Sequence, residues 1–194
     1  MFRSPVNIRD AEPGDVDELM EVWANRGSDR VLALPDRQEA IASLARIAAD
    51  PDQRLLTAVI DDRIVGAVLL VRGSLSPVHS ESAVYVLHLQ VVDEFRRHGV
   101  GRALMEAAVT WAEEKDSLHV IAAASASSRD ANRFMARLGL GQFAVVRGAT
   151  VNAMRAKLPL EPPAVARVGT RHHRTVGQVL VQRRSLRRAQ GRAT

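Results

Sequence analysis

The chain has 194 residues, of which 46% are apolar and 25% charged, and its formal net charge is +5. These values are typical of a globular protein with one main domain. The absence of cysteine excludes disulfides, thiolate metal ligands and a cysteine nucleophile. No apolar run is long enough to span a bilayer and the first ten residues lack the apolar core of a signal peptide, so we expect a cytoplasmic protein.

The first 50 residues predict one strand and two helices. Residues 6–9 form the strand, and a turn at Pro13-Gly14-Asp15 leads into an amphipathic helix that reaches about residue 25. A second helix is expected over 36–49, because apolar residues recur there on one face. Asp50-Pro51 then ends it.

Three strands are expected next. Residues 55–60 and 64–71 are rich in β-branched and aliphatic side chains, and the short turn 61–63 joins them as a hairpin. Residues 73–82 read as a loop. Residues 83–92 are almost continuously apolar, which predicts a strand that is buried on both faces.

The remaining elements complete a single domain. A helix follows the glycines near residue 100, and then come a strand over 118–124 and a helix over 127–138. A closing hairpin is expected from 143–147 and 150–158. The order of elements predicts an α/β (α+β) fold, with a mixed sheet flanked by about four helices, over residues 1–160.

The most informative stretch is RRHGVGR, residues 96–102, where a helix is expected to begin. Helix N-termini carry unpaired N–H groups and a partial positive charge, so they bind anions. Gly99 and Gly101 would let a ligand approach the backbone, and Arg96, Arg97 and Arg102 add charge. A phosphate or pyrophosphate site is therefore predicted, although a plain glycine turn between strand and helix is the other interpretation. The third glycine of a dinucleotide fingerprint and the Gly-Lys-Ser/Thr of a Walker loop are missing.

Residues 89–104, LQVVDEFRRHGVGRAL, resemble the acetyl-CoA-binding segment of the GCN5-related N-acetyltransferases, the GNAT superfamily. Leu89 and Val91 match its strand, and Arg96, Gly99 and Gly101 match its loop. The stretches VNIRDAEPGDVDEL and ANRFMARLGLGQF are similar to the family's first strand and helix and to its second motif. The resemblance covers about residues 5–159. It departs from the family where proline is common two residues after the strand valine, because an aspartate stands there.

The resemblance implies how acetyl-CoA would bind. The strand of the glycine segment would splay from its neighbour, and the main chain of Leu89 and Val91 would bind pantetheine in the gap. The Val91 amide would polarise the thioester carbonyl. The pyrophosphate would lie on the loop and the first helical turn, formed by Arg96, Arg97, His98, Gly99, Val100, Gly101 and Arg102.

The resemblance also implies a direct attack by an amine on the thioester, with a base to deprotonate the amine. Family members often carry a glutamate on the strand 83–92, where this chain has Tyr85 and His88. His88 has the right intrinsic pKa, a hydrogen-bonded histidine on a sheet is the other interpretation, and Glu81 in the preceding loop is a further candidate. The tyrosine that commonly acts as acid is replaced by Met135, so either Ser128 or water would protonate the thiolate, or the thiol would leave without such help.

Residues 161–194 lie outside the resemblance and form a basic extension. They contain eight arginines and a single acidic residue, Glu161. An amphipathic helix is expected from about residue 174, to pack on the domain or a partner subunit. The alternatives are binding to an anionic surface such as nucleic acid, or a segment that stays disordered. The adjacent histidines 172 and 173 lack further ligands and lie among arginines, so no metal site is expected.

Two functions follow as hypotheses. The first is an acetyl-CoA-dependent N-acetyltransferase that acts on a primary amine of unknown identity, bound between residues 23–35 and 74–82. The second is a catalytically weak GNAT-like binding module whose basic tail contacts nucleic acid or a partner protein. A homodimer is compatible with both, since dimers are common in the family.

Overall fold

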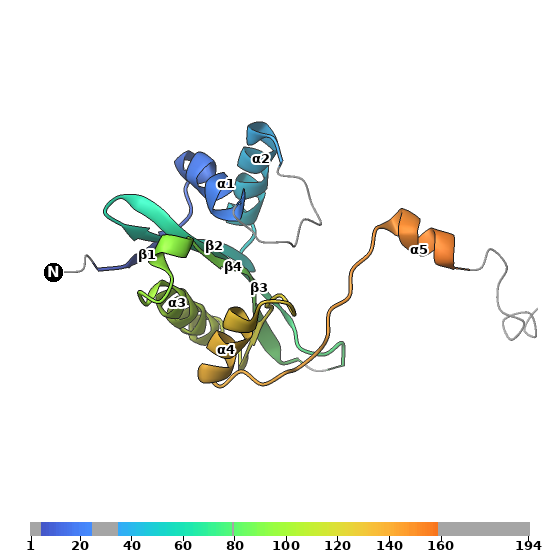
Figure 1. The fold of residues 1–194 in the computed structure, drawn as a ribbon. Helices are drawn as coiled ribbons and strands as arrows, with labels where there is room; N and C mark the ends of the chain where they lie inside the picture. The colour runs from blue at the N-terminus through green and yellow to red at the C-terminus, as the bar shows by residue number, and fades with distance from the viewer. Residues whose placement is uncertain (1–4, 25–34, 79, 159–194) are drawn as a thin grey trace, which may run out of the picture. The chain divides into compact units, whose positions relative to one another are not determined.

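The structure is a computed structural model that describes residues 5–24, 35–78 and 80–158 (Figure 1). Its contacts divide the chain after Phe143 into two units. The helix expected from residue 174 lies outside the described residues.

The first unit contains all the strands of the described chain. Its elements in order are β1 (Asn7–Asp10), η1 (Pro13–Asp15), α1 (Val16–Ala24), α2 (Arg37–Ala48), β2 (Gln53–Ile60), β3 (Arg63–Ser74), β4 (Ser82–Val91), η2 (Asp93–Phe95), α3 (Val100–Glu114), β5 (His119–Ala122) and α4 (Arg129–Arg137). The elements predicted up to residue 138 are confirmed, with ends that shift by a few residues.

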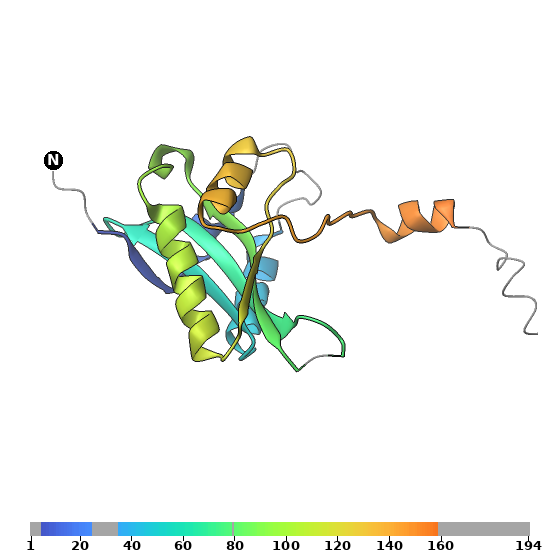
Figure 2. The ribbon, with the colours of Figure 1, turned by 90° about the horizontal axis from the view of Figure 1, so that it is seen from below.

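The sheet is mixed, as predicted. Its strands lie in the order β1-β2-β3-β4-β5, with antiparallel pairing throughout except between β4 and β5, which are parallel. Helix α3 makes the crossover between these two parallel strands. Helices α1 and α2 cover one face of the sheet, and α3 and α4 lie on the other (Figures 1 and 2).

Each face of the sheet has its own apolar core. On the α3 side, Leu104, Ala108 and Trp111 pack against strand residues such as Val65 and Val86. On the α1 side, a smaller apolar cluster contains Leu19, Val22, Leu55, Ile64 and Ala67. The helical spacing on α3 therefore buries one full stripe of that helix and fixes where its N-terminus lies relative to β4.

The closing hairpin predicted over 143–158 is wrong. Residues 141–150 form no helix or strand, and Val151–Lys157 form the helix α5. Thr150 caps this helix, because its Oγ1 accepts a hydrogen bond from the Ala153 N–H at 3.2 Å. The valines at 145, 146 and 151 suggested strands, but the good helix formers after Thr150 and the hydroxyl cap favour a helix.

Candidate active site

The candidate site is the gap where β4 and β5 separate. Their parallel pairing joins Ala83–Val86 to His119–Ala122, and the Ala123 N–H donates to the Val86 carbonyl at 3.0 Å. From Leu87 to Val91, β4 has no strand beside it on this side within the described residues. An unpaired strand edge offers main-chain donors and acceptors to an extended ligand.

A β-bulge in β4 sets which main-chain groups face the gap. Leu87 pairs with Leu69 but Gln90 pairs with Ala67, so His88 and Leu89 together oppose a single residue of β3. His88 has a φ of 55°, in the left-handed region that non-glycine residues rarely adopt.

The direction of the Leu89 and Val91 amides follows from one further hydrogen bond. The Val92 N–H donates to the Val65 carbonyl at 2.9 Å and therefore points toward β3. Because successive residues of a strand point their main-chain groups in opposite directions, Val91 and Leu89 point toward the gap. The main chain of both residues is thus directed into the gap, and their role toward pantetheine stays a prediction.

Residues 96–99, which we call the glycine loop, lead into a helix N-terminus without a side-chain cap. After η2, Arg97 and Gly99 both have a positive φ, 62° and 89°, and α3 begins at Val100. Gly99 is the N-cap and offers no capping atom, and the first turn contains no acidic residue. The N–H groups of Val100, Gly101 and Arg102 therefore remain available to an anion.

Gly101 lies against helix α4. A Cβ at this position would lie 3.4 Å from the Cζ of Phe134 on α4, which is an ordinary contact distance. The packing of α4 therefore does not by itself require glycine at this position.

The basic side chains of the loop are exposed but not equivalent. Arg96 is held by Asp93 at 2.7 Å, and its Nε lies 3.5 Å from the Val91 carbonyl oxygen. The Nδ1 of His98 lies 2.7 Å from the Arg96 carbonyl oxygen. Arg97 and Arg102 are exposed next to the uncapped helix turn and add positive charge there.

His88 and Tyr85 lie in different parts of β4. The exposed His88 forms the bulge, and its carbonyl accepts a hydrogen bond from the Trp23 indole at 3.2 Å. Tyr85 lies in the half of β4 that pairs with β5, and its hydroxyl donates to the Ser74 carbonyl at 3.0 Å. The tyrosine hydroxyl is therefore directed to the end of the sheet opposite the bulge.

Ser128 is the N-cap of α4, where its Oγ accepts from the Ala131 N–H at 3.2 Å. This bond uses the hydroxyl as an acceptor and leaves its proton for another partner. Met135, at the family's tyrosine position, is only 8% exposed and packs inward. Glu81 contacts His119 at 3.5 Å, next to the beginning of β4 rather than to the gap.

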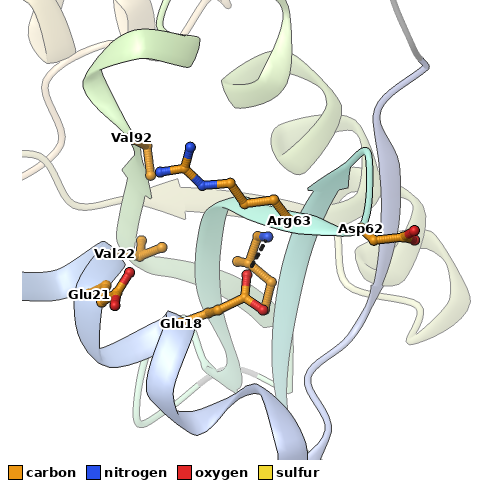
Figure 3. Close-up of a pocket in the computed structure, with 7 residues that line it drawn as sticks. Glu18, Glu21, Val22, Asp62, Arg63 and Val92 are labelled. Atoms are coloured by element: carbon orange, nitrogen blue, oxygen red, sulfur yellow. Dashed lines mark hydrogen bonds between the residues drawn. The ribbon is translucent and has the colours of Figure 1, made fainter.

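A separate pocket of about 310 Å³ lies on the α1 side, beside the end of β4 (Figure 3). The acidic residues Glu18, Glu21 and Asp62 line it together with Arg63 and apolar groups, and the Asp62 side chain points away from the two glutamates. The Glu18 carboxylate has a structural role, because its Oε2 accepts a 2.7 Å hydrogen bond from the Ile64 N–H and so joins α1 to β3. Sequence reasoning missed this pocket because α1 and the β2–β3 turn come together only in the fold.

Two further findings concern the described residues alone. No group of three or more histidine, aspartate or glutamate side chains could hold a metal ion there. No helix among them combines the length and apolar character that a membrane span requires.

Residues 17–140 match the Acetyltransferase (GNAT) family. The chain belongs to this family. It is 27% identical over 134 residues to an uncharacterized N-acetyltransferase of Mycobacterium tuberculosis, an alignment that covers 64% of this chain and 82% of that one. Its membership identifies the chain as an acetyltransferase and confirms the predicted resemblance.

Solved structures share the fold of this GNAT chain. A putative acetyltransferase from Agrobacterium tumefaciens superimposes with a TM-score of 0.62 at 21% identity, covering 74% of this chain and 99% of that one. The enzyme AAC(6')-Iy, solved with a bisubstrate analogue of CoA and an acetylneamine, gives 0.63 at 17% identity, covering 76% and 98%. These similarities show the GNAT fold.

Proposed function

We propose that this chain transfers the acetyl group of acetyl-CoA to a primary amine by direct attack, without a covalent enzyme intermediate. Acetyl-CoA supplies the activated acyl group. The observation that carries the proposal is the unpaired edge of β4, which is followed, after η2 and a short loop, by the uncapped N-terminus of α3. An extended amide chain that ends in a diphosphate fits this combination of groups.

The main chain of β4 binds and orients the thioester in this proposal. Leu89 and Val91 direct their amides into the gap, and pantetheine carries amide groups that can pair with such an edge. The Val91 N–H would donate to the thioester carbonyl oxygen, where negative charge develops during attack. Because the strand fixes this donor before the reaction, it needs no reorganisation.

The diphosphate is assigned to the first turn of α3. The N–H groups of Val100, Gly101 and Arg102 point outward from an uncapped helix end, and Arg97 supplies additional charge. Fixed main-chain donors at a helix N-terminus suit phosphate oxygens well.

Two side chains are assigned to proton transfer. His88 lies on the exposed bulge at the open edge of β4, so its imidazole would take a proton from the acceptor ammonium and leave the neutral amine that attacks the thioester. Ser128 would donate a proton to the departing thiolate, because its hydroxyl proton is not used by the cap bond. We give Tyr85 no proton-transfer role, since its hydroxyl holds the Ser74 carbonyl.

Two assays test the proposal. Isothermal titration with acetyl-CoA should show one site per chain, and thiol release should appear with at least one member of a panel of amino sugars, polyamines, amino acids and N-terminal peptides. Absence of acetyl-CoA binding at millimolar concentration would refute the proposal. Binding without thiol release for any amine would instead favour the degenerate binding module.

A further inference from the structure

We propose that Trp23 is a positioning residue for the cofactor-binding edge. Its indole N–H holds the carbonyl of His88 and so fixes the bulge that turns the Leu89 and Val91 amides toward the gap. The inference deepens the proposed function and rests on it, because the edge matters only if an acyl-CoA binds there.

The contact joins two elements that are far apart in the sequence. Trp23 lies in the last turn of α1, and its Nε1 donates to the His88 carbonyl at 3.2 Å across 65 positions. The indole also packs against the apolar cluster between α1 and the sheet, which contains Leu19 and Val22. Packing therefore fixes the donor before any ligand arrives.

Helix α1 is anchored to the sheet at its other end as well. Glu18 accepts the hydrogen bond from the Ile64 N–H at 2.7 Å, at the beginning of β3 (Figure 3). Trp23 and Glu18 thus hold main-chain groups of β4 and β3 from the same helix. This second bond limits how far α1 can shift if the first is removed.

The bulge changes which side of β4 each amide faces. The Val86 carbonyl points to β5, because it accepts from Ala123, whereas the Val92 N–H points to β3, because it donates to Val65. In a regular strand, the main-chain N–H and carbonyl groups of two residues six positions apart point to the same side of the strand. The extra residue at His88 therefore inverts the alternation.

Without this inversion, the Val91 N–H would point to β3 rather than into the gap. The bulge must be maintained although His88 adopts a φ of 55°, which is unfavourable for a residue with a side chain. The bulge also removes the His88 carbonyl from the regular ladder, and a carbonyl needs a replacement partner. The Trp23 indole supplies that partner.

The substitution Trp23→Phe removes the donor and keeps an aromatic ring in the cluster. We expect the Kd for CoA to rise by about 3- to 10-fold, in keeping with the loss of one hydrogen bond. The matched control is Trp111→Phe, because Trp111 is 4% exposed in the α3 core and lies in the last turn of α3, at the end opposite the anion site. This variant should lower the Tm and leave the Kd unchanged.

A rescue separates positioning from general destabilisation. Glycine adopts a positive φ without strain. In the His88→Gly variant, the bulge should therefore depend less on the hydrogen bond from the Trp23 indole. The double variant Trp23→Phe/His88→Gly should bind CoA within about twofold of His88→Gly alone, since the two effects act through the same bulge. Equal losses from Trp23→Phe in both backgrounds would contradict a role through the bulge.

A measurement on the protein without ligand tests the inference even if CoA does not bind. The chain has two tryptophans, so Trp111→Phe assigns the indole proton signals in NMR spectra. The Trp23 indole proton should exchange slowly with solvent, and Trp23→Phe should shift the Leu89 and Val91 amide signals. Wild-type protein that fails to bind CoA would refute the proposed function while these signals could still support the positioning role. Fast indole exchange, unchanged amide signals or wild-type CoA affinity in Trp23→Phe would overturn the inference.

Discussion

At the scale of single residues, the site depends more on missing side chains than on present ones. Gly99 allows the positive φ of 89° that begins α3, and as N-cap it leaves the first helical N–H groups uncapped. Gly101 then removes the side chain from the second position of that turn. The neighbouring arginines add charge, but the fixed donors are main-chain amides.

A charge placed in this turn should block the anion site. Gly101→Glu sets a carboxylate beside the amides, and its Cβ, 3.4 Å from Phe134, fits with little adjustment. We expect acetyl-CoA affinity to fall by at least about tenfold, whereas the neutral Gly101→Gln should lose much less. Titration calorimetry measures both. Equal affinities for the two variants would show that the diphosphate binds elsewhere.

The proposed base is tested by His88→Asn. Asparagine tolerates the left-handed conformation of the bulge, so the change removes the imidazole with little effect on the main chain. Thiol release at pH 7 should fall by roughly 10²-fold or more, with an almost unchanged Kd for CoA. A variant that keeps wild-type turnover would leave water as the proton acceptor and refute the assignment.

At the scale of elements, the connection between β1 and α1 fixes the helix that carries Trp23. The Arg9 guanidinium contacts both carboxylate oxygens of Asp15, at 2.6 and 2.9 Å, and the Glu12 N–H donates to the same carboxylate at 2.7 Å. The hydrogen bond from Arg9 lowers the pKa of Asp15 below its ordinary value. The carboxylate therefore stabilises the folded state at neutral pH.

This connection predicts a pH-dependent stability. Because the folded pKa is depressed, the stabilisation is present above the unfolded pKa of about 4 and is lost as the pH falls through the folded pKa. Asp15→Asn should lower the free energy of unfolding by about 1–3 kcal/mol at pH 7 and flatten its decrease toward pH 3. Urea titrations at both pH values measure this. The exposed pair of Asp17 with Arg37 is the control, and Asp17→Asn should change little.

Local sequence patterns predicted most of the helices and strands. The features that they did not predict depend on which strands pair with one another. The apolar periodicity of 16–24 and 100–114 and the aliphatic run of 83–92 indicated their structures correctly. The bulge at His88 was not predictable, because it depends on its register with β3. The helix at 151–157 was misread because valines at 145, 146 and 151 resemble a strand when no partner strand is specified.

At the scale of the whole molecule, every group assigned to binding and proton transfer lies in the unit that ends at Phe143. The open edge, the loop, α3 and Ser128 are all contained in it. The segment after it exposes several apolar side chains, among them Val146 and Val151 at 89% and 78% exposure. The basic extension adds positive charge but none of the groups assigned here.

A chain truncated after Phe143 should therefore fold and bind acetyl-CoA. We expect a cooperative unfolding transition and a Kd within about threefold of the full-length value, a difference below 1 kcal/mol. Circular dichroism and titration calorimetry on both chains measure this. A truncated chain that folds but loses binding would show that later residues contribute to the site.

The central claim is that main-chain amides of β4 and α3 bind the acyl donor together. An NMR titration of the ¹⁵N-labelled full-length protein with CoA tests it most directly. The account predicts that the largest saturable amide shifts occur at Leu89, Val91, Val100, Gly101 and Arg102. Shifts confined to the α1-side pocket or to the basic extension, with these five amides unchanged, would contradict it.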